Sequence, residues 1–295
     1  MLEIRNWRLY QSPISNLQSP FPMSVTNLAK RRGTILDEIM TFHRENLPKV
    51  MREVSFENVR AFASTAPPPN DFFAAPRQPG VSLIAECKKA SPSKGLMVPN
   101  YNPVQLARAY VQGGARAISV LTDGRHFQGS LAHLHDVREA VAGQKIPVLR
   151  KDFIFHPYQI YEARAAGADA VLLITAVLGE SDLRDLLKLT HQLGMDALVE
   201  VHSEAELEKA LAVQPRIVGV NNRNLQTFEV DFQNTARLRQ LIPAEVAVVA
   251  ESGLKTAADV RTMRQINVDA ILVGETLVKS KNREAAVKEL VAAGR

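Results

Sequence analysis

Short runs of consecutive apolar and β-branched residues recur along the chain, with mixed polar and apolar segments of helix length between them. Eight such runs cover residues 81–86, 117–121, 146–150, 170–174, 197–200, 217–221, 246–251 and 270–274. Because neighbouring positions within each run are apolar, the pattern predicts strands that are buried on both faces. Successive runs end 21 to 35 residues apart. This spacing holds a loop, a helix and a second loop, so we expect parallel strands joined by helical crossovers.

A weak internal repeat precedes four of these runs. Residues 114–118, 167–171, 194–198 and 267–271 each begin with Gly or Asn, three positions before the strand. Gly and Asn adopt the left-handed conformation that ends a helix, so each repeat predicts a helix end followed by a strand. Eight such units within about 215 residues favour an α/β fold of the (β/α)8 TIM barrel class over a doubly wound sheet.

The chain before the barrel has two parts. Residues 35–59 show apolar positions at helical spacing, with Thr34 and Asp37 or Glu38 as an N-cap and Pro48 as a point where the helix could divide. Residues 1–33 form an extension rich in Ser and Pro, interpreted as a loose tail or a docking strap, with an organelle transit peptide as the alternative. The predicted organisation is this extension followed by a single barrel domain, with its N-terminal helical extension, at 34–295.

Composition narrows the class of ligand. Of 295 residues, 46% are hydrophobic and 23% charged, as in ordinary globular proteins. The single cysteine, Cys87, excludes an intramolecular disulfide and a cysteine-based zinc site, so a cytoplasmic location is the default. The net charge of +5 suits an anionic small molecule. No basic stripe with interleaved aromatic residues predicts nucleic-acid binding, and no apolar run is long enough to predict a membrane span.

Histidine spacing does not predict a metal site. Six histidines lack the spacing of metal ligands, and we expect them to be surface or structural residues: His126, His133, His135, His156, His191 and His202. No metal is therefore expected.

Charged and polar residues stand at the carboxyl ends of the predicted strands, where barrels of this kind build their active sites. They are Glu86, Lys88, Lys151, Glu200, Asn221, Arg223, Glu251 and Ser252. Alternation along a strand turns Glu86 and Lys88 to one side and Cys87 to the other, and it separates Asn222 from Asn221 and Arg223 in the same way. Two lysines and three glutamates converging from four strands are costly to bury, so they indicate a binding or catalytic requirement.

Glycines follow the last two predicted strands. Gly253 and Gly274 allow backbone N–H groups to approach an anion near a helix N-terminus, the usual phosphate site of such barrels. Ser252 and Arg223 could complete this site. The small residues at 91–95, after the first strand, suit either a lid or an ordinary surface turn.

Together these residues resemble the indole-3-glycerol phosphate synthase family, from about Thr34 to the end of the chain. The segments that carry the resemblance are 84–95, 127–130, 149–154, 198–202, 219–225, 250–253 and 273–275. It implies conversion of 1-(2-carboxyphenylamino)-1-deoxyribulose 5-phosphate into indole-3-glycerol phosphate, carbon dioxide and water, a step of tryptophan biosynthesis, without cofactor or metal.

The resemblance also implies roles for individual residues. Lys151 matches the acid for ring closure, Lys88 the lysine used with the substrate carboxylate and in dehydration, and Glu86 its partner. Glu200 matches a proton-transfer carboxylate, and Asn221 and Glu251 match positions that orient substrate and catalytic groups. The phosphate-side positions are Ser91, Arg223, Ser252, Gly253, Gly274 and Glu275, the last through its backbone N–H. The anthranilate ring would be walled by Phe127, Phe153, Leu173 and Leu225, although packing inside the barrel explains Leu173 equally well.

Two other functions stay open at this point. Phosphoribosylanthranilate isomerase is another phosphate-binding barrel enzyme, but it uses a cysteine and an aspartate, and Cys87 is predicted to face outward. A non-catalytic phosphosugar-binding barrel is the second alternative, which the lysines and Glu200 argue against. We expect a monomer or weak homo-oligomer, and association with other tryptophan-pathway enzymes is left open.

Overall fold

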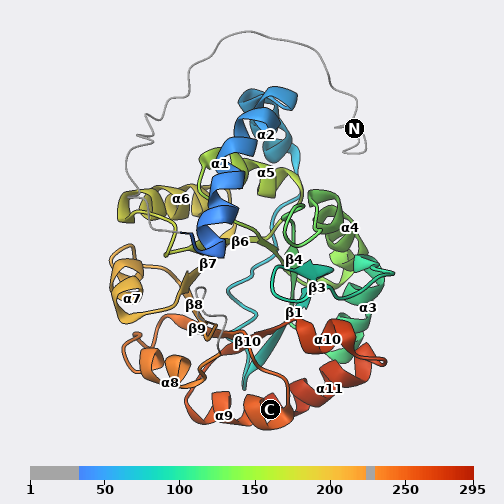
Figure 1. Ribbon diagram of the computed structural model, residues 1–295. Coiled ribbons are helices and arrows are strands. Elements are labelled where there is room, and N and C mark those ends of the chain that lie inside the picture. The colour runs from blue at the N-terminus through green and yellow to red at the C-terminus, as the bar shows by residue number, and fades with distance from the viewer. Residues whose placement is uncertain (1–32, 224–229) are drawn as a thin grey trace.

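The computed structural model describes residues 33–223 and 230–295, and its centre is a closed barrel of eight parallel strands (Figure 1). The strands are β1 (Ser82–Cys87), β4 (Ala117–Leu121), β5 (Val148–Lys151), β6 (Ala170–Ile174), β7 (Asp196–Val201), β8 (Ile217–Asn221), β9 (Ala247–Glu251) and β10 (Ala270–Val273). Each pairs with its neighbours in chain order, and β1 closes the ring against β10. All eight predicted strands are confirmed, with every boundary within two residues.

An outer ring of helices surrounds the strands (Figure 1). It consists of α3 (Pro103–Gly113), α4 (Leu131–Val141), α5 (Pro157–Ala165), α6 (Glu180–Gln192), α7 (Glu204–Leu211), α8 (Gln233–Arg239), α9 (Ala257–Gln265), α10 (Glu275–Lys279) and α11 (Arg283–Gly294). A short 3-10 turn, Ala142–Gln144, follows α4. The predicted helix ends are confirmed, since Gly114, Gly167, Gly194 and Asn267 all have positive φ, from 57° to 99°.

Two helices precede the barrel, α1 (Ile35–Glu53) and α2 (Phe56–Thr65). Thr34 and Asp37 form the predicted capping box at the start of α1. The expectation of one helix divided at Pro48 is wrong, because Pro48 lies inside α1 and the break comes at Val54 and Ser55. Val54 is extended there, and the Ser55 hydroxyl accepts the Asn58 N–H, so a new N-cap ends one helix and begins the next.

The N-terminal helices pack on one side of the barrel. Val59 and Ala63 of α2 lie in an apolar cluster with Tyr158 and Ala165 of α5. The Tyr158 hydroxyl donates to the Val54 carbonyl at 3.0 Å, which fixes the turn between α1 and α2. From this anchor α1 extends to the edge of the barrel opening (Figure 1). The predicted extension at 1–33 lies almost wholly outside the described residues.

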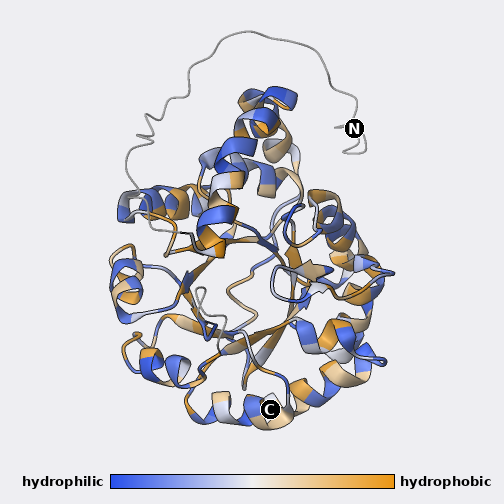
Figure 2. Cartoon of the chain, in the orientation of Figure 1, coloured by the Kyte–Doolittle hydropathy of each residue, from blue (hydrophilic) through white to orange (hydrophobic). Residues whose placement is uncertain are grey.

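The core lies between the strands and the ring of helices. Figure 2 shows hydrophobic residues along the strands and on the inner sides of the helices, with hydrophilic residues facing outward. Cys87 is fully buried, with its Sγ directed at the Pro103 carbonyl of α3, as strand alternation predicts. Within the described ranges, no helix is both long and apolar enough to cross a membrane.

Candidate active site

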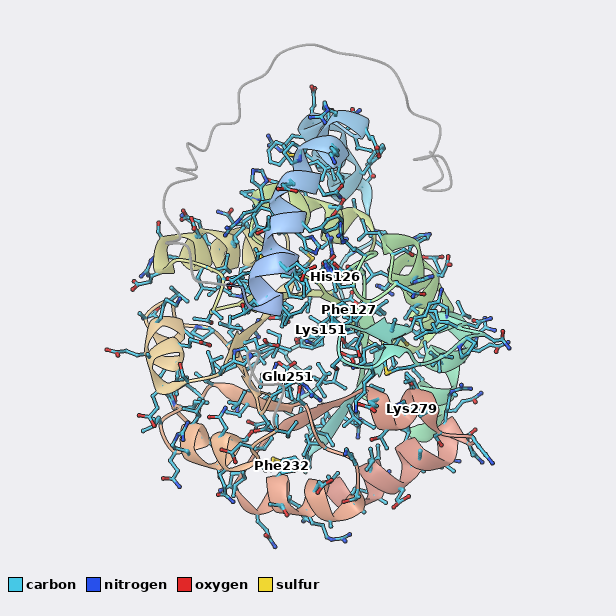
Figure 3. The ribbon with its side chains drawn as sticks, viewed as in Figure 1. His126, Phe127, Lys151, Phe232, Glu251 and Lys279 are labelled. Carbon is cyan, nitrogen blue, oxygen red and sulfur yellow. The ribbon has the colours of Figure 1, made fainter. Side chains whose placement is uncertain are left out.

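A cavity of about 420 Å³ opens at the carboxyl ends of the strands. Figure 3 shows Lys151 and Glu251 within the barrel opening. The sequence-predicted residues that line the cavity are Glu86, Lys88, Phe127, Lys151, Phe153, Glu200, Asn221, Arg223, Glu251, Ser252, Gly253, Gly274 and Glu275. The barrel therefore brings together residues that are up to 189 positions apart in the chain, from 86 to 275.

Three predicted residues are not found in the lining. Leu173 is fully buried but lies outside it, and its neighbours Leu172 and Ile174 line the cavity instead, because alternate residues of β6 face opposite sides. Ser91 belongs to a small hairpin, β2 (Ala90–Ser91) with β3 (Gly95–Leu96), which presents its turn to the cavity through Pro92, Ser93 and Lys94. Leu225 lies outside the described residues.

Four charged side chains come from alternate strands of the ring. Glu86, Lys151, Glu200 and Glu251 stand on β1, β5, β7 and β9, which are the first, third, fifth and seventh strands of the barrel. In barrels of this kind, side chains from alternate strands form one layer across the interior, and that layer is ordinarily filled by branched apolar residues. Here the layer nearest the opening is ionic.

Lys151 lies between two of these carboxylates. Its Nζ is 3.5 Å from Glu200 Oε2 and 3.4 Å from Glu251 Oε2. Burial alone would lower the pKa of Lys151, but the charges of Glu251, Glu200 and Glu86 outweigh that effect and raise it. Lys151 is therefore an ammonium group throughout the neutral range.

The two carboxyl groups next to Lys151 differ in proton affinity. Burial, together with the charges of Glu200 and Glu86, raises the pKa of Glu251 to about 8 against the opposing effect of Lys151. Burial also acts to raise the pKa of Glu200, but Lys151, His202 and Asn221 more than offset it and lower that pKa. Near pH 7 the set thus contains an ionised Glu200 and a protonated Glu251, a division of the kind that separates acid and base roles.

Two glycines make room for the carboxylates. A Cβ on Gly219 of β8 would overlap the Glu251 Oε1 atom, and a Cβ on Gly274 would overlap the Glu86 carboxylate. At both positions a neighbouring carboxyl group occupies the space that a side chain would need.

Lys88 forms a separate pair nearer the first strand. Its Nζ lies 2.8 Å from Glu86 Oε1, and its side chain is 19% exposed against 5% for Glu86. Lys88 can therefore leave Glu86 to contact an anion that enters the cavity, whereas the Glu86 carboxylate remains buried deeper in the barrel.

The loops after β9 and β10 offer backbone N–H groups beside this pair. Ser252 and Gly253 both have positive φ, at 65° and 83°, and successive residues of this kind can form an anion-binding concavity. The start of α10 at Gly274 has no side-chain cap. The Glu275 carboxylate accepts from Lys279 at 2.6 Å, and this hydrogen bond lowers its pKa, so its charge is satisfied within the helix.

Sequence reasoning missed several lining residues. The apolar side chains Ile35, Leu36 and Ile39 of α1 and Phe232 before α8 contribute to the walls, and Lys255 adds a cation. The helical spacing of Ile35 and Ile39 was visible in the sequence. What that face of α1 covers depends on how the helix docks.

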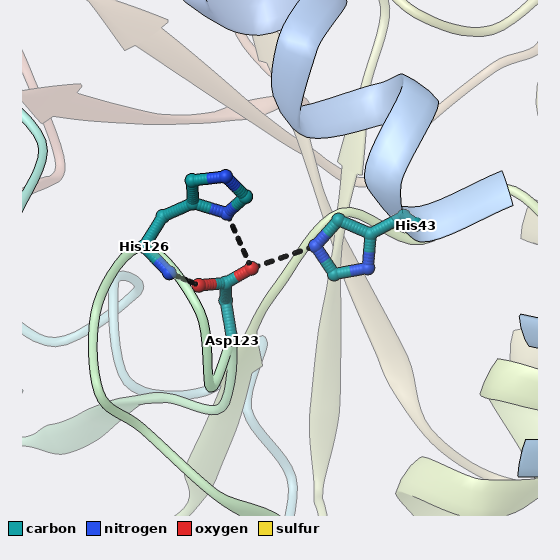
Figure 4. Close-up of side chains that lie close together, drawn as sticks. All are labelled: His43, Asp123 and His126. Carbon is teal, nitrogen blue, oxygen red and sulfur yellow. Dashed lines mark hydrogen bonds and ion pairs between the residues drawn. The ribbon is translucent and has the colours of Figure 1, made fainter. Parts of the chain in front are cut away.

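A cluster of two histidines and an aspartate joins α1 to the loop after β4 (Figure 4). Asp123 Oδ2 is 2.7 Å from His43 Nε2 and 3.1 Å from His126 Nδ1. Its Oδ1 accepts the Phe127 N–H at 3.0 Å. Burial alone would raise the pKa of Asp123, but the hydrogen bonds with both imidazoles hold it at about 2.

In residues 33–223 and 230–295 this is the one group of His, Cys, Asp and Glu side chains close enough to share a metal ion. The hydrogen bonds of Asp123 already explain why the three side chains lie together. The cluster therefore fastens α1 over the cavity. His43 lies 80 residues before Asp123 in the chain, so no local spacing could reveal the contact between them.

Comparison with known proteins shows which family this chain is similar to. A family model described as Indole-3-glycerol phosphate synthase matches residues 36–290. A protein of that name from Mycobacterium ulcerans is 50% identical over 262 residues, covering 89% of this chain and 95% of its own length. Another from Dehalococcoides mccartyi is 47% identical over 258 residues, covering 87% of this chain and all of its own.

Solved structures with low sequence identity share the fold. The 3-hexulose-6-phosphate synthase of Salmonella typhimurium superposes with a TM-score of 0.59 at 10% identity, covering 72% of this chain and 98% of its own. The thiamine phosphate pyrophosphorylase of Pyrococcus furiosus gives 0.56 at 16% identity, covering 72% and 95%. At such identities the likeness shows the barrel architecture alone.

The tight approach of Glu251 to Gly219 predicts the effect of a single methyl group. Gly219→Ala should lower the free energy of unfolding by about 1–3 kcal/mol, because the new Cβ forces the Glu251 carboxylate from its position. Gly143→Ala is the matched control, since its Cβ would meet nothing within 4 Å. Urea unfolding of both variants tests this, and equal stability of the two would show that the space at Gly219 is not needed.

The raised pKa of Glu251 predicts a pH-dependent contribution to stability. Its carboxyl has an ordinary pKa of 4.5 in the unfolded chain and about 8 in the folded protein. Between these values the folded state binds the extra proton, so this group makes folding less favourable as pH rises. Glu251→Gln should therefore gain stability relative to the wild type, on the order of a few kcal/mol, between about pH 5 and 8. A difference in unfolding free energy that stays constant across this range would contradict the assignment.

Proposed function

The chain belongs to the indole-3-glycerol phosphate synthase family, and we propose how the side chains of its cavity divide the reaction among them. The enzyme is a carboxy-lyase of tryptophan biosynthesis that closes the indole ring of its phosphorylated substrate with loss of carbon dioxide and water. The position of Lys151 between Glu200 and Glu251 is the observation that carries the proposal.

Lys151 serves ring closure. When the aromatic carbon attacks the keto carbon of the sugar chain, negative charge develops on the keto oxygen. A preorganised ammonium group in a buried site stabilises that charge and can donate a proton to it. The carboxylates beside Lys151 keep it charged before substrate binds, and they fix its position below the opening.

Lys88 holds the substrate carboxylate and assists the later loss of water. Its contact with Glu86 orients the ammonium group before substrate binds. Glu200 is the proton-transfer carboxylate of the dehydration, and Asn221 and Glu251 orient the catalytic groups. Support for these roles comes from the hydrogen bond between Glu200 and Asn221 and from the shared contact of both glutamates with Lys151.

The phosphate group binds at the loops after β9 and β10. Backbone N–H groups at Ser252, Gly253 and Glu275 face the anion, and Arg223 adds charge from the end of β8. Because the Glu275 carboxylate is paired with Lys279, it need not repel the phosphate. Ser91 acts through the hairpin that carries Ser93 and Lys94 to the cavity.

The aromatic ring of the substrate lies against the apolar side of the cavity. Phe127 and Phe153 have ring centroids 6.2 Å apart and both line it. We assign to Leu172 the wall position that the sequence analysis gave to Leu173, because Leu172 faces inward. The role of Leu225 stays a prediction, as do the monomeric or weakly oligomeric state and the cytoplasmic location.

The geometry of Cys87 does not favour the isomerase alternative. That chemistry needs a cysteine within reach of the substrate, and Cys87 is fully buried against α3 on the outer side of β1. Burial and the charge of Glu86 raise the pKa of its thiol, so it is a poor acid–base group.

Removing each lysine in turn should block different steps. Lys151→Met should lower turnover by roughly 10²- to 10⁴-fold, because the acid for ring closure is lost, while the phosphate contacts that bind substrate remain. Indole fluorescence follows the reaction. Turnover within a few-fold of the wild type would remove Lys151 from this role.

A substrate analogue whose keto group is reduced to a hydroxyl separates the two lysines, because it keeps the carboxylate and phosphate but cannot cyclise. Its binding should weaken more in Lys88→Met than in Lys151→Met, since only Lys88 contacts the carboxylate, in an interaction worth roughly 1.5–3 kcal/mol. Calorimetry measures both affinities. Equal losses would leave the two lysines without distinct roles.

Substitutions on the phosphate side should act on binding. Arg223→Ala and Ser252→Ala should raise KM with little change in kcat, because phosphate contacts are similar before and during ring closure. Steady-state kinetics separates the two constants. A fall in kcat at unchanged KM would place these residues nearer the reacting atoms.

A further inference from the structure

The reaction draws one proton from water in every turnover. The substrate enters as a carboxylate and leaves that charge behind when neutral carbon dioxide departs. Two protons are added to the keto oxygen before it leaves as water, and one is released from the sugar carbon next to nitrogen. The balance is one proton taken up, and it must reach groups that bound substrate shields from the opening.

A line of three side chains leads from the cavity wall to the surface. His202 Nε2 is 3.4 Å from Glu200 Oε1, and His202 Nδ1 is 3.2 Å from Glu206 Oε2. The side chains of Glu200, His202 and Glu206 are 3%, 13% and 23% exposed, so exposure rises step by step toward solvent.

The local fold holds the imidazole in this bridging position. His202 follows the end of β7, two residues after Glu200, and Glu206 lies in the first turn of α7, whose N-cap is Ser203. Glu206 Oε2 also accepts the backbone N–H of His202 at 2.8 Å. Nδ1 is thereby fixed at the outer carboxylate, while the buried Nε2 lies 3.4 Å from the interior one without a hydrogen bond to it, although the sequence analysis expected only a surface or structural histidine.

We propose that Glu206 and His202 form a relay that carries protons from water to Glu200, an inference that rests on the proposed proton-transfer role of Glu200. Glu200 is ionised at rest, and the charged ring of His202 gives it a proton as dehydration begins: an N–H bond at Nε2 breaks and an O–H bond forms on Glu200. Glu200 passes this proton to the departing oxygen and is a carboxylate again. The neutral ring then reorients so that its unprotonated nitrogen meets water beside Glu206, takes a proton from that water and returns to Glu200 as the imidazolium.

The carboxyl groups around His202 fit this role. Burial alone would lower the pKa of His202, but Glu206, Glu200 and Glu251 outweigh it and raise the pKa. These groups therefore favour the charged ring, which has a proton to give to Glu200.

Chemical rescue tests the relay in the full-length enzyme. His202→Ala should lower kcat by about tenfold or more with KM little changed, because proton uptake becomes slow. Added imidazole should restore kcat in proportion to its concentration, since it can occupy the space left by the ring. His202→Gln keeps hydrogen bonding but cannot carry a proton, so it should stay slow. Glu206→Gln should show a smaller loss, and His135→Ala, on α4, should show neither loss nor rescue.

The outcomes distinguish the relay from the proposed function. Wild-type kcat in His202→Ala, or full activity in His202→Gln, would overturn the relay, because the ring would then serve packing or hydrogen bonding alone. A loss in His202→Ala that imidazole does not restore would also overturn it. Glu200→Gln tests the carboxylate itself, since an inactive Glu200→Gln with a fully active His202→Ala rejects only the relay. A fully active Glu200→Gln rejects the role of Glu200.

Discussion

One ammonium group, that of Lys151, lies between two buried carboxylates, and the rest of the site depends on that charge balance. Burying three ionisable groups is costly unless they pair, and one cation cannot neutralise two anions. The outcome is a protonated Glu251 beside an ionised Glu200 near neutral pH. The same imbalance keeps Lys151 charged and provides groups that can exchange protons. The reaction needs such groups, because two protons are added to the substrate and one is removed.

The barrel explains how such a cluster can exist. Lys151, Glu200 and Glu251 stand on alternate strands, so closing the ring brings them to one level, and Gly219 on the intervening strand β8 leaves the space that Glu251 occupies. The apolar layers below supply the stability that this ionic layer does not. Above it, α1 covers the apolar side of the cavity and is held there by His43 and Asp123. The cavity thus has a charged base, an apolar wall and backbone N–H groups at one corner, to which we assign the reacting atoms, the aromatic ring and the phosphate of the substrate.

Much of this was predictable because buried parallel strands have a simple signature. Continuous apolar runs at regular spacing predicted the strands, and glycines predicted the helix ends. Polar residues at the strand ends predicted the charged layer of the barrel. The continuous apolar sequence of β6 also explains why Leu173 was predicted to line the cavity in place of Leu172. When every residue of a strand is apolar, no polar neighbour indicates which face points inward. The contacts of His43 with Asp123 and of His202 with Glu200 and Glu206 depend on how distant or successive elements dock, and the spacing of residues in the sequence does not reveal it. Pro48 was expected to be the point where the first helix divides, but the N-cap at Ser55 determines where the helix breaks.

A crystal structure with the reduced substrate analogue would test the arrangement most directly. The Lys151 ammonium should lie within hydrogen-bond distance of the hydroxyl that replaces the keto oxygen, still in contact with Glu200 and Glu251. Lys88 should contact the carboxylate, and the phosphate should meet the backbone at Ser252, Gly253 and Glu275. An analogue bound with its carboxylate on Lys151, or with its phosphate away from the loops after β9 and β10, would contradict the assignment of charges on which the whole site depends.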